Sequence, residues 1–212
     1  MNDSTILTRN RLLGEEVVKA LKSRFFDAYY CETQEQSVIK ALSLIPERST
    51  VTWGGSKTIR DIGLTSAVKS GNYIAYDRDE IPPSERTRFV REHFFSDVYL
   101  TSANALTQDG ILFNIDGMGN RVASMIYGPE NVIVVVGINK IVKDIDAAIS
   151  RARNTAAPTN AQRFDIKTPC KATGKCADCK SPDCICSYMV ATRLCNPKNK
   201  IKVIIVGDYL GF

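Results

Sequence analysis

Apolar residues recur along this chain at helical spacing and at strand spacing in turn. From residue 8 to 25 the apolar residues fall three or four positions apart, which predicts an amphipathic helix. The same reasoning predicts further helices over 32–45, 58–70, 84–95, 118–127 and 144–153. Strands are predicted over 27–32, 49–56, 73–77, 131–137 and 201–212, with two more within 97–116 and a surface connection over 154–166.

Alternation of strands and helices predicts an α/β sandwich with a mainly parallel sheet. The run NVIVVVG at 131–137 is apolar on both faces, which is typical of a strand at the buried centre of such a sheet. The turn at Asp109-Gly110 predicts one antiparallel pair, so we expect a mixed sheet. A single domain over 6–212 accounts for the whole pattern.

Composition places the chain among soluble globular proteins. It has 212 residues, of which 44% are hydrophobic and 24% charged, and a net charge of +5 spread along the sequence. This charge pattern gives no support for nucleic-acid binding. No apolar run reaches the roughly 20 residues that span a bilayer, and the first residues lack an apolar signal core. We therefore expect a cytoplasmic protein without a membrane partner; its oligomeric state stays open, a homodimer included.

A glycine turn after the second predicted strand is a candidate anion site. Gly54 and Gly55 let the backbone approach a ligand closely, and Ser56, Lys57 and Thr58 add hydroxyl groups and a positive charge. The turn matches neither common nucleotide-binding motif. A tight turn that simply caps the next helix is the equally open alternative.

A second candidate is the turn Asn114–Arg121, which follows another predicted strand. Arg121 has the geometry to hold a carboxylate or phosphate through two hydrogen bonds. Asp116 is either a base or the partner of Arg121. Asn104 precedes the predicted hairpin, where a turn role alone explains it. Lys140 follows the central strand, either as a cation at the same sheet edge or as a solvated lysine.

Three stretches together resemble the LUD domain, the lactate-utilisation family: WGGSKT, TSANALTQDGILFNIDGMGNRVA and YGPENVIVVVGINKIVKDIDAAISRAR. The resemblance covers residues from about 6 to 166 and the final VIIVGDYLGF. It implies the three-layer, Rossmann-like sandwich shared by glucosamine-6-phosphate deaminase, ribose-5-phosphate isomerase and CoA transferases. In those proteins the glycine loop and neighbouring strand ends bind phosphorylated or acyl ligands.

By that analogy a ligand pocket forms at the carboxyl ends of the strands. Lys140 is included because it follows the predicted central strand at the same edge of the sheet. The candidate ligand-binding residues are then Gly54, Gly55, Ser56, Thr58, Asn104, Asn114, Asp116, Gly117, Gly119, Asn120, Arg121 and Lys140. No motif matches the catalytic glutamate of the CoA transferases. The sequence therefore predicts a bound anion and assigns no reaction.

Six of the seven cysteines lie within residues 167–195, just before the last strand. Thiolates suit zinc and iron–sulfur clusters, and the two-residue gap between Cys176 and Cys179 brings two sulfurs within reach of one ion. We expect one metal centre, either zinc or a [4Fe–4S] cluster. Three disulfides are the alternative, which a reducing cytoplasm disfavours.

The resemblance also selects among these cysteines. Similar LUD tails carry another residue where Cys184 stands, so the implied ligands are Cys170, Cys176, Cys179 and Cys186, with Cys184 as the alternate. This tail marks the short, stand-alone type of LUD protein. Cys195 and Cys31 are expected to pack in the interior.

Three functional hypotheses follow. The first is a LUD protein that binds a small anion, in lactate or related 2-hydroxy-acid utilisation, and carries a structural metal. It predicts that Arg121→Ala weakens ligand binding and leaves the fold intact. The second is an iron–sulfur module for electron transfer or sensing, with redox protein partners. The third is an interaction subunit whose pocket binds nothing.

Overall fold

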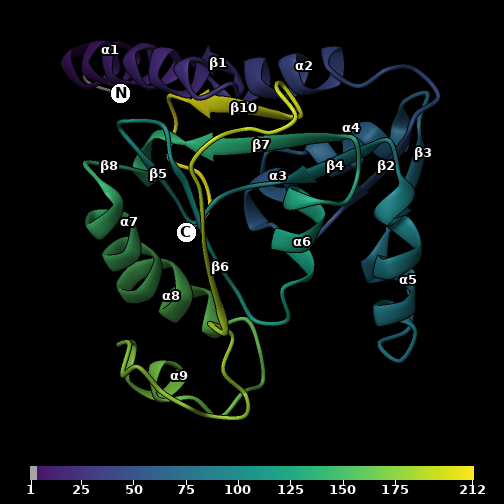
Figure 1. Cartoon of the computed structure of the whole chain (residues 1–212), viewed down its shortest axis with the longest axis vertical. Coiled ribbons are helices and arrows are strands. Elements are labelled where there is room, and N and C mark those ends of the chain that lie inside the picture. The colour runs from purple at the N-terminus through teal and green to yellow at the C-terminus, as the bar shows by residue number, and fades with distance from the viewer. Residues whose placement is uncertain (1–3) are drawn as a thin grey trace.

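A six-stranded parallel sheet forms the centre of the computed structural model, which describes residues 4–212 (Figure 1). Its strand order is β1-β10-β7-β4-β2-β3, and every pairing is parallel. The strands are β1 Asp27–Cys31, β2 Thr50–Trp53, β3 Ile74–Asp77, β4 Val98–Thr101, β7 Asn131–Gly137 and β10 Ile201–Val206. The predicted central strand β7 lies between β10 and β4, as its apolar faces require.

A second, smaller sheet has the order β8-β5-β6-β9. Its strands are β5 Ala105–Thr107, β6 Leu112–Asp116, β8 Ile141–Val142 and β9 Tyr188–Thr192. β5 and β6 are antiparallel, which confirms the predicted hairpin. The sequence predicted two strands in 97–116, and this is wrong: the segment holds three. The chain leaves the first sheet after Thr101, and the backbone N–H of Asn104 then bonds to Phe113 in the hairpin.

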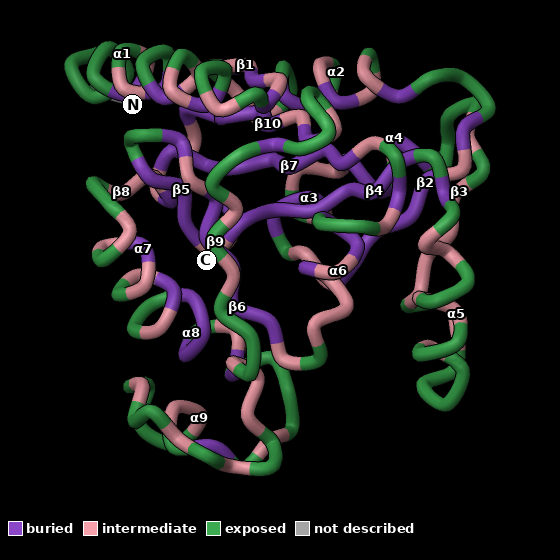
Figure 2. The backbone as a smooth tube through the Cα atoms, viewed as in Figure 1, coloured by how far each residue is buried: buried purple, intermediate pink, exposed green. Residues whose placement is uncertain are grey.

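Helices cover both faces of the parallel sheet, and α7 packs on the second sheet. The helices of the described residues are α1 Ser4–Ser23, α2 Gln34–Ser43, α3 Lys57–Asp61, α4 Leu64–Ser70, α5 Arg86–Glu92, α6 Asn120–Ile126, α7 Ile145–Arg151, α8 Ala157–Ala161 and α9 Pro169–Thr173. Side chains of β7 alternate between two cores: Val132, Val134 and Val136 face α1, α6 and the second sheet, whereas Ile133 and Val135 face α2, α3 and α4. The result is the expected three-layer α/β fold, with its buried residues concentrated in the sheets (Figure 2).

Two predicted elements differ from the structure. The helix over 58–70 is broken into α3 and α4, because Gly63 adopts φ 79°, a left-handed conformation that cannot continue a helix. The predicted connection over 154–166 is helical as far as Ala161, because a π turn at Ala152–Ala156 joins α7 to α8.

The cysteine-rich segment contains α9 and β9, neither of which was predicted. β9 extends the second sheet by pairing antiparallel with β6. The predicted interior positions of Cys195 and Cys31 are confirmed, with exposed fractions of 1% and 7%. None of the helices within residues 4–212 has both the length and the apolar composition needed to cross a membrane.

Candidate functional site

A cavity of about 280 Å³ opens where β2, β4, β6 and β7 end. Nine of the twelve candidate ligand residues line it: Gly55, Ser56, Thr58, Asn104, Asp116, Gly117, Asn120, Arg121 and Lys140. These residues come from turns that are far apart in sequence. The parallel sheet brings the turns together at its carboxyl edge, as expected for an open α/β fold.

The other three candidates support the cavity from outside. Asn114 is 1% exposed and accepts a hydrogen bond from Arg121. Gly119 has φ 78° and begins α6. Gly54 packs under the hydroxyl of Tyr99, where a Cβ atom would approach the phenol oxygen to 2.7 Å.

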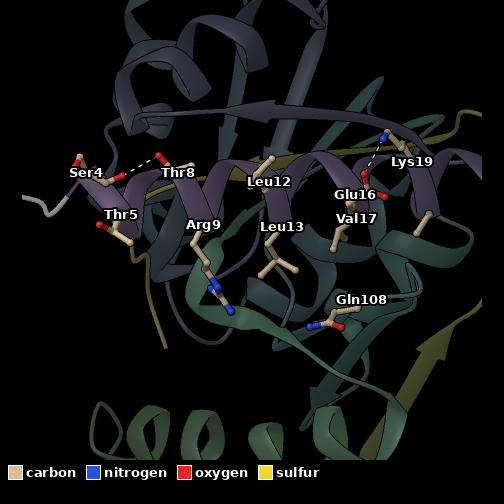
Figure 3. Close-up of a pocket in the computed structure, with 11 residues that line it drawn as sticks. Ser4, Thr5, Thr8, Arg9, Leu12, Leu13, Glu16, Val17, Lys19 and Gln108 are labelled. Atoms are coloured by element: carbon tan, nitrogen blue, oxygen red, sulfur yellow. Dashed lines mark hydrogen bonds and ion pairs between the residues drawn. The ribbon is translucent and has the colours of Figure 1, made fainter.

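A wider groove of about 1080 Å³ follows the outer surface of α1 (Figure 3). Its lining includes Leu12, Leu13 and Gln108, and its charged residues pair along the helix, as in the contact between Lys19 and Glu16. This groove is wide open to solvent along the helix, and its exposed lining surface is mainly apolar. We therefore take the smaller strand-end cavity as the candidate site, since small-molecule sites combine concavity with convergent polar groups.

Arg121 holds the two turns of the cavity together. Its terminal nitrogens donate to the carbonyl oxygens of Ser102 and Ile115 and to the amide oxygens of Asn104 and Asn114. The side chain keeps 18% exposure, on the side that faces the cavity. Because each terminal nitrogen already donates two hydrogen bonds, all four terminal N–H donors are used, and this guanidinium has only its Nε–H for a ligand.

The carboxylate of Asp116 is likewise engaged in hydrogen bonds within the protein. Its carboxylate accepts hydrogen bonds from the backbone N–H groups of Gly119, Arg121 and Val122 at 3.0–3.2 Å. These are the free donors at the start of α6, so Asp116 fixes the turn in front of that helix. The arginine Nε lies 3.8 Å from the carboxylate.

Lys140 lies deep in the cavity at 3% exposure. Its Nζ contacts the hydroxyl groups of Thr58 and Ser102 at 3.0 Å each and the carbonyl oxygen of Ala103 at 3.2 Å. Burial, and secondly the positive charges of Arg151 and Arg121, lower the pKa of Lys140 to about 7. Of the two earlier interpretations, the solvated lysine is excluded.

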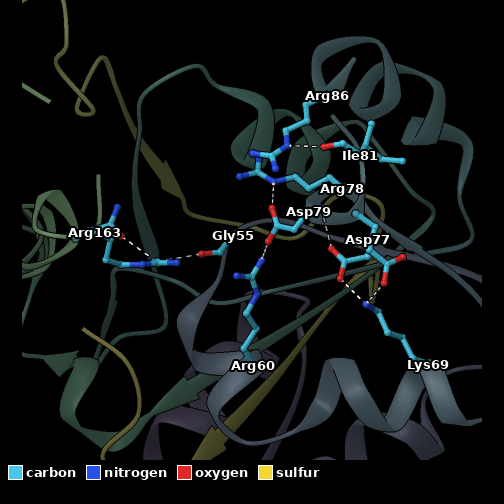
Figure 4. Close-up of polar contacts among 11 residues, drawn as sticks. Gly55, Arg60, Lys69, Asp77, Arg78, Asp79, Ile81, Arg86 and Arg163 are labelled. Carbon is cyan, nitrogen blue, oxygen red and sulfur yellow. Dashed lines mark hydrogen bonds and ion pairs between the residues drawn. The ribbon is translucent and has the colours of Figure 1, made fainter. Parts of the chain in front are cut away.

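Unpaired donors also face the cavity. Within residues 4–212, the Ser56 hydroxyl and the Nε of Arg78 are buried and have no hydrogen-bond partner. Arg78 follows the end of β3, and its Nε lies 3.6 Å from the carboxylate of Asp79, which is too long for a hydrogen bond (Figure 4). Arg163 reaches the cavity from beyond α8 and donates to the carbonyl oxygen of Gly55 at 3.3 Å.

Sequence reasoning missed Arg78, Ser102 and Arg163. The first two directly follow strands of the parallel sheet, so their positions after β3 and β4 were a usable signal. Arg163 lies in the segment that was taken for a connection, and no sequence pattern pointed to it.

Positive charge dominates the cavity wall. Within the described residues, five basic side chains line it, namely Lys57, Arg78, Arg121, Lys140 and Arg163, against one acidic side chain, that of Asp116. That carboxylate is already bonded to three backbone N–H groups. The arrangement suits a small anion and disfavours a cation.

A separate cavity of about 50 Å³ gathers the cysteines. Cys170, Cys176, Cys179, Cys184 and Cys186 all line it, and none forms a disulfide. Arg153 donates to the sulfur of Cys176 at 3.6 Å and to Asp178 at 2.5 Å. Burial, and then the neighbouring Cys184, Cys170 and Cys176, raise the pKa of Cys186 to about 12.

These sulfurs line one space without forming a finished ligand cage. In the described part of the chain, no three histidine, cysteine, aspartate or glutamate side chains stand in metal-binding geometry. The predicted set and the alternate Cys184 are equally placed at the cavity, so the structure does not choose among them. A bound ion requires the sulfurs to draw closer.

The two cavities share a wall. Ile185 lines both of them, and a Cβ atom on Gly117 would lie 3.2 Å from the Cα of Ile185. The missing side chain at Gly117 therefore lets the cysteine segment pack against the strand-end cavity.

Comparison with known proteins identifies the family. The model of the LUD domain matches residues 14–206. The fold is similar to the crystal structure of a DUF162 family protein from Deinococcus radiodurans, with a TM-score of 0.55 and 14% identity over 93% of this chain and 98% of that chain. No curated protein matches the sequence. Because the family model spans most of the sequence, this chain belongs to the LUD domain family.

Proposed function

We propose that this protein binds a small anion, a carboxylate or a phosphate, in the strand-end cavity. The observation that carries the proposal is the charge of the cavity wall, where five cationic side chains face one internally bonded carboxylate among the described residues. The Ser56 hydroxyl and the Arg78 guanidinium are the donors best placed to meet the ligand, because both are buried with an unpaired donor. A buried donor without a partner is costly, and a bound anion removes that cost.

The LUD family is associated with lactate utilisation, which makes lactate and related 2-hydroxy acids the first ligands to test. A cavity of about 280 Å³ is at the small end of ligand sites and has room for a molecule of this size. Inorganic phosphate is the second probe, since the same donors serve either anion.

Isothermal titration with L-lactate and with phosphate tests the proposal. Arg78→Gln removes one charged donor from the cavity and is expected to weaken binding about 10- to 100-fold, because a hydrogen bond to a charged group contributes about 1.5–3 kcal/mol. Arg88→Gln makes the same charge change on exposed α5, where Arg88 pairs with Glu92, and is expected to leave affinity unchanged. Equal affinity of all three proteins, or no binding of either anion, would count against the site.

A second candidate function is metal binding by the cysteine segment. The observation that favours it is the convergence of five cysteines on one cavity. From Pro169 to Leu194 no residue is buried, so this segment has no hydrophobic core of its own (Figure 2). Small segments of this kind are commonly held by a structural metal, which supplies folding free energy directly.

Thiolate ligands fit both zinc and a [4Fe–4S] cluster. A cavity of about 50 Å³ has space for about three to five water molecules at about 10–15 Å³ each, which favours a single ion over a cluster of eight atoms. Bound zinc would act as a structural clip, whereas a cluster would supply electron transfer or sensing and call for redox protein partners.

Metal and acid-labile sulfide analysis of anaerobically purified protein separates these outcomes. One zinc per chain without sulfide is expected, and Cys179→Ser is expected to lose it. Cys31→Ala, which alters a cysteine in β1 away from the segment, is the control and should keep it. Iron with matching sulfide would establish the cluster, and neither metal nor sulfide would reject the metal centre.

A further inference from the structure

Lys140 combines burial, position and surroundings that anion binding alone does not require. It ends the 3₁₀ turn Ile138–Lys140, which follows directly from the central strand β7. That placement attaches its backbone to the end of the fully buried central strand. Its amine is then held by the Thr58 and Ser102 hydroxyl groups and the Ala103 carbonyl oxygen.

Among residues 4–212 no acidic side chain contacts this amine, and the charged side chains that act on it are the cations Arg151 and Arg121. Together with burial, they hold the pKa of Lys140 near 7, so a large share of the amine is neutral at neutral pH. Buried lysines in cationic surroundings serve as nucleophiles towards carbonyl groups for this reason.

The hydrogen bonds of the site accommodate the neutral amine. A neutral amine donates two hydrogen bonds and accepts one at its lone pair. The Ala103 carbonyl oxygen can only accept, whereas each hydroxyl group can either accept or donate. All three contacts therefore survive deprotonation of Lys140, and the lone pair becomes free when one hydroxyl group turns away.

We propose that Lys140 forms an imine with a small oxo acid, a carboxylate that also carries an aldehyde or ketone. This inference rests on the proposed anion site and names the substrate class for it. The cations of the cavity wall would hold the carboxylate, and the amine would face the carbonyl carbon.

The reaction balances without an oxidant or a reductant. The Nζ lone pair adds to the carbonyl carbon and gives a carbinolamine. The former carbonyl oxygen takes up both protons of the amine nitrogen, passed on through the neighbouring Thr58 and Ser102 hydroxyl groups, and leaves as water. The C=O bond is thus replaced by a C=N bond, and addition of water reverses the process.

Trapping with glyoxylate and cyanoborohydride tests the inference on the intact chain. Cyanoborohydride delivers hydride to the imine carbon and leaves a stable secondary amine, which peptide mass spectrometry can locate. We expect one adduct on the peptide that contains Lys140, in wild type and in Lys19→Arg. Lys19 lies on α1, outside this cavity, and is exposed and paired with Glu16, so it serves as the control for an ordinary surface lysine. Lys140→Met should give no adduct at this position.

Acetaldehyde tests the substrate class, since it carries the same aldehyde without the carboxylate. Labelling of Lys140 by acetaldehyde should be at least about tenfold slower than labelling by glyoxylate, which corresponds to about 1.4 kcal/mol from the anion contacts. Equal rates, or labelling spread over exposed lysines, would overturn the inference. The position of the adduct in the wild type, located by peptide mass spectrometry, tests the inference even if Lys140→Met fails to fold.

Binding measurements keep the two proposals separate. L-lactate and phosphate have no carbonyl that forms an imine, so their binding reports on the anion site alone. If they bind and glyoxylate leaves no adduct on Lys140, the imine inference fails and the anion site stands. If neither anion binds, the proposed function itself fails.

Discussion

Replacement of Arg121 by alanine should destabilise the whole domain, against the sequence-based expectation that the fold stays intact. The guanidinium donates to two carbonyl oxygens and two amide oxygens, which lie on two segments of the chain, the loop after β4 and strand β6. Some of these acceptors keep another donor: Asn104 still accepts from the Ile115 N–H, and the Ser102 carbonyl from the Thr101 hydroxyl. The Asn114 amide loses its bond from Arg121 and already has an unpaired nitrogen.

The magnitude follows from these contacts. Removing one partner of a buried charged network typically costs about 3–5 kcal/mol. Because Asp116 keeps its three backbone donors and water can enter from the cavity, we expect the lower end, about 3 kcal/mol. For a domain of this length that corresponds to a fall in Tm of about 6–12 °C.

Thermal and urea unfolding of Arg121→Ala, beside Arg163→Ala, measure the effect. Arg163 lines the same cavity, but it is an exposed residue that bonds to Gly55 and Asn160, so its loss should stay within about 0.5 kcal/mol. A Tm of Arg121→Ala within about 2 °C of the wild type would refute the assignment of Arg121 to the scaffold of the site.

Three further predictions concern other parts of the molecule. The unfolding free energy of the wild type should rise between pH 7 and 10.5, by at most about 1.4 kcal/mol per pH unit, because unfolding restores the ordinary pKa of Lys140 and takes up a proton. Urea unfolding of Lys140→Met across this range should lack that contribution, and an unchanged slope would contradict the lowered pKa. Gly117→Val should push against the Ile185 backbone, because a Cβ atom on Gly117 would lie 3.2 Å from the Ile185 Cα. Amide hydrogen exchange should then become faster in the cysteine segment but not in β7. Equal exchange rates in the wild type and the variant would show that the contact is loose. Gly110→Ala should destabilise the domain by at least about 1 kcal/mol, because Gly110 has φ 88° and lies against the backbone of Ala20, and an unchanged Tm would contradict this contact.

The parallel sheet was predictable because the sequences of its central strands are themselves typical of buried strands. β7 and β10 are apolar on both faces, and each is bounded by polar or glycine residues. The break at Gly63 and the helical continuation to Ala161 were not predictable at the same level. A single glycine is tolerated inside many helices, and a π turn depends on packing around Ala152 and Ala156 that periodicity alone does not reveal.

Part of the site could be predicted from the positions of the strand ends. The residues that directly follow strands, such as Ser56 and Lys140, reach the cavity because the carboxyl ends of parallel strands meet at one edge. Residue type alone misjudged Arg121, because a guanidinium that recognises a ligand and one that braces two turns have the same chemistry. The distinction lies in the acceptors around it, and those come from segments that only the fold brings together.

Ile185 gives the two candidate sites a physical connection. It stands between Cys184 and Cys186, so any movement that draws these sulfurs onto an ion also moves the Ile185 backbone, which lies against Gly117 in the wall of the anion cavity. If the proposed metal orders this segment, it should change the shape of the strand-end cavity without touching the proposed anion. Such coupling is reciprocal: if the metal alters the affinity for the anion by some factor, the anion alters the affinity for the metal by the same factor. Titration of either one in the presence of the other measures this factor, and identical affinities with and without the second partner would show that Ile185 transmits nothing.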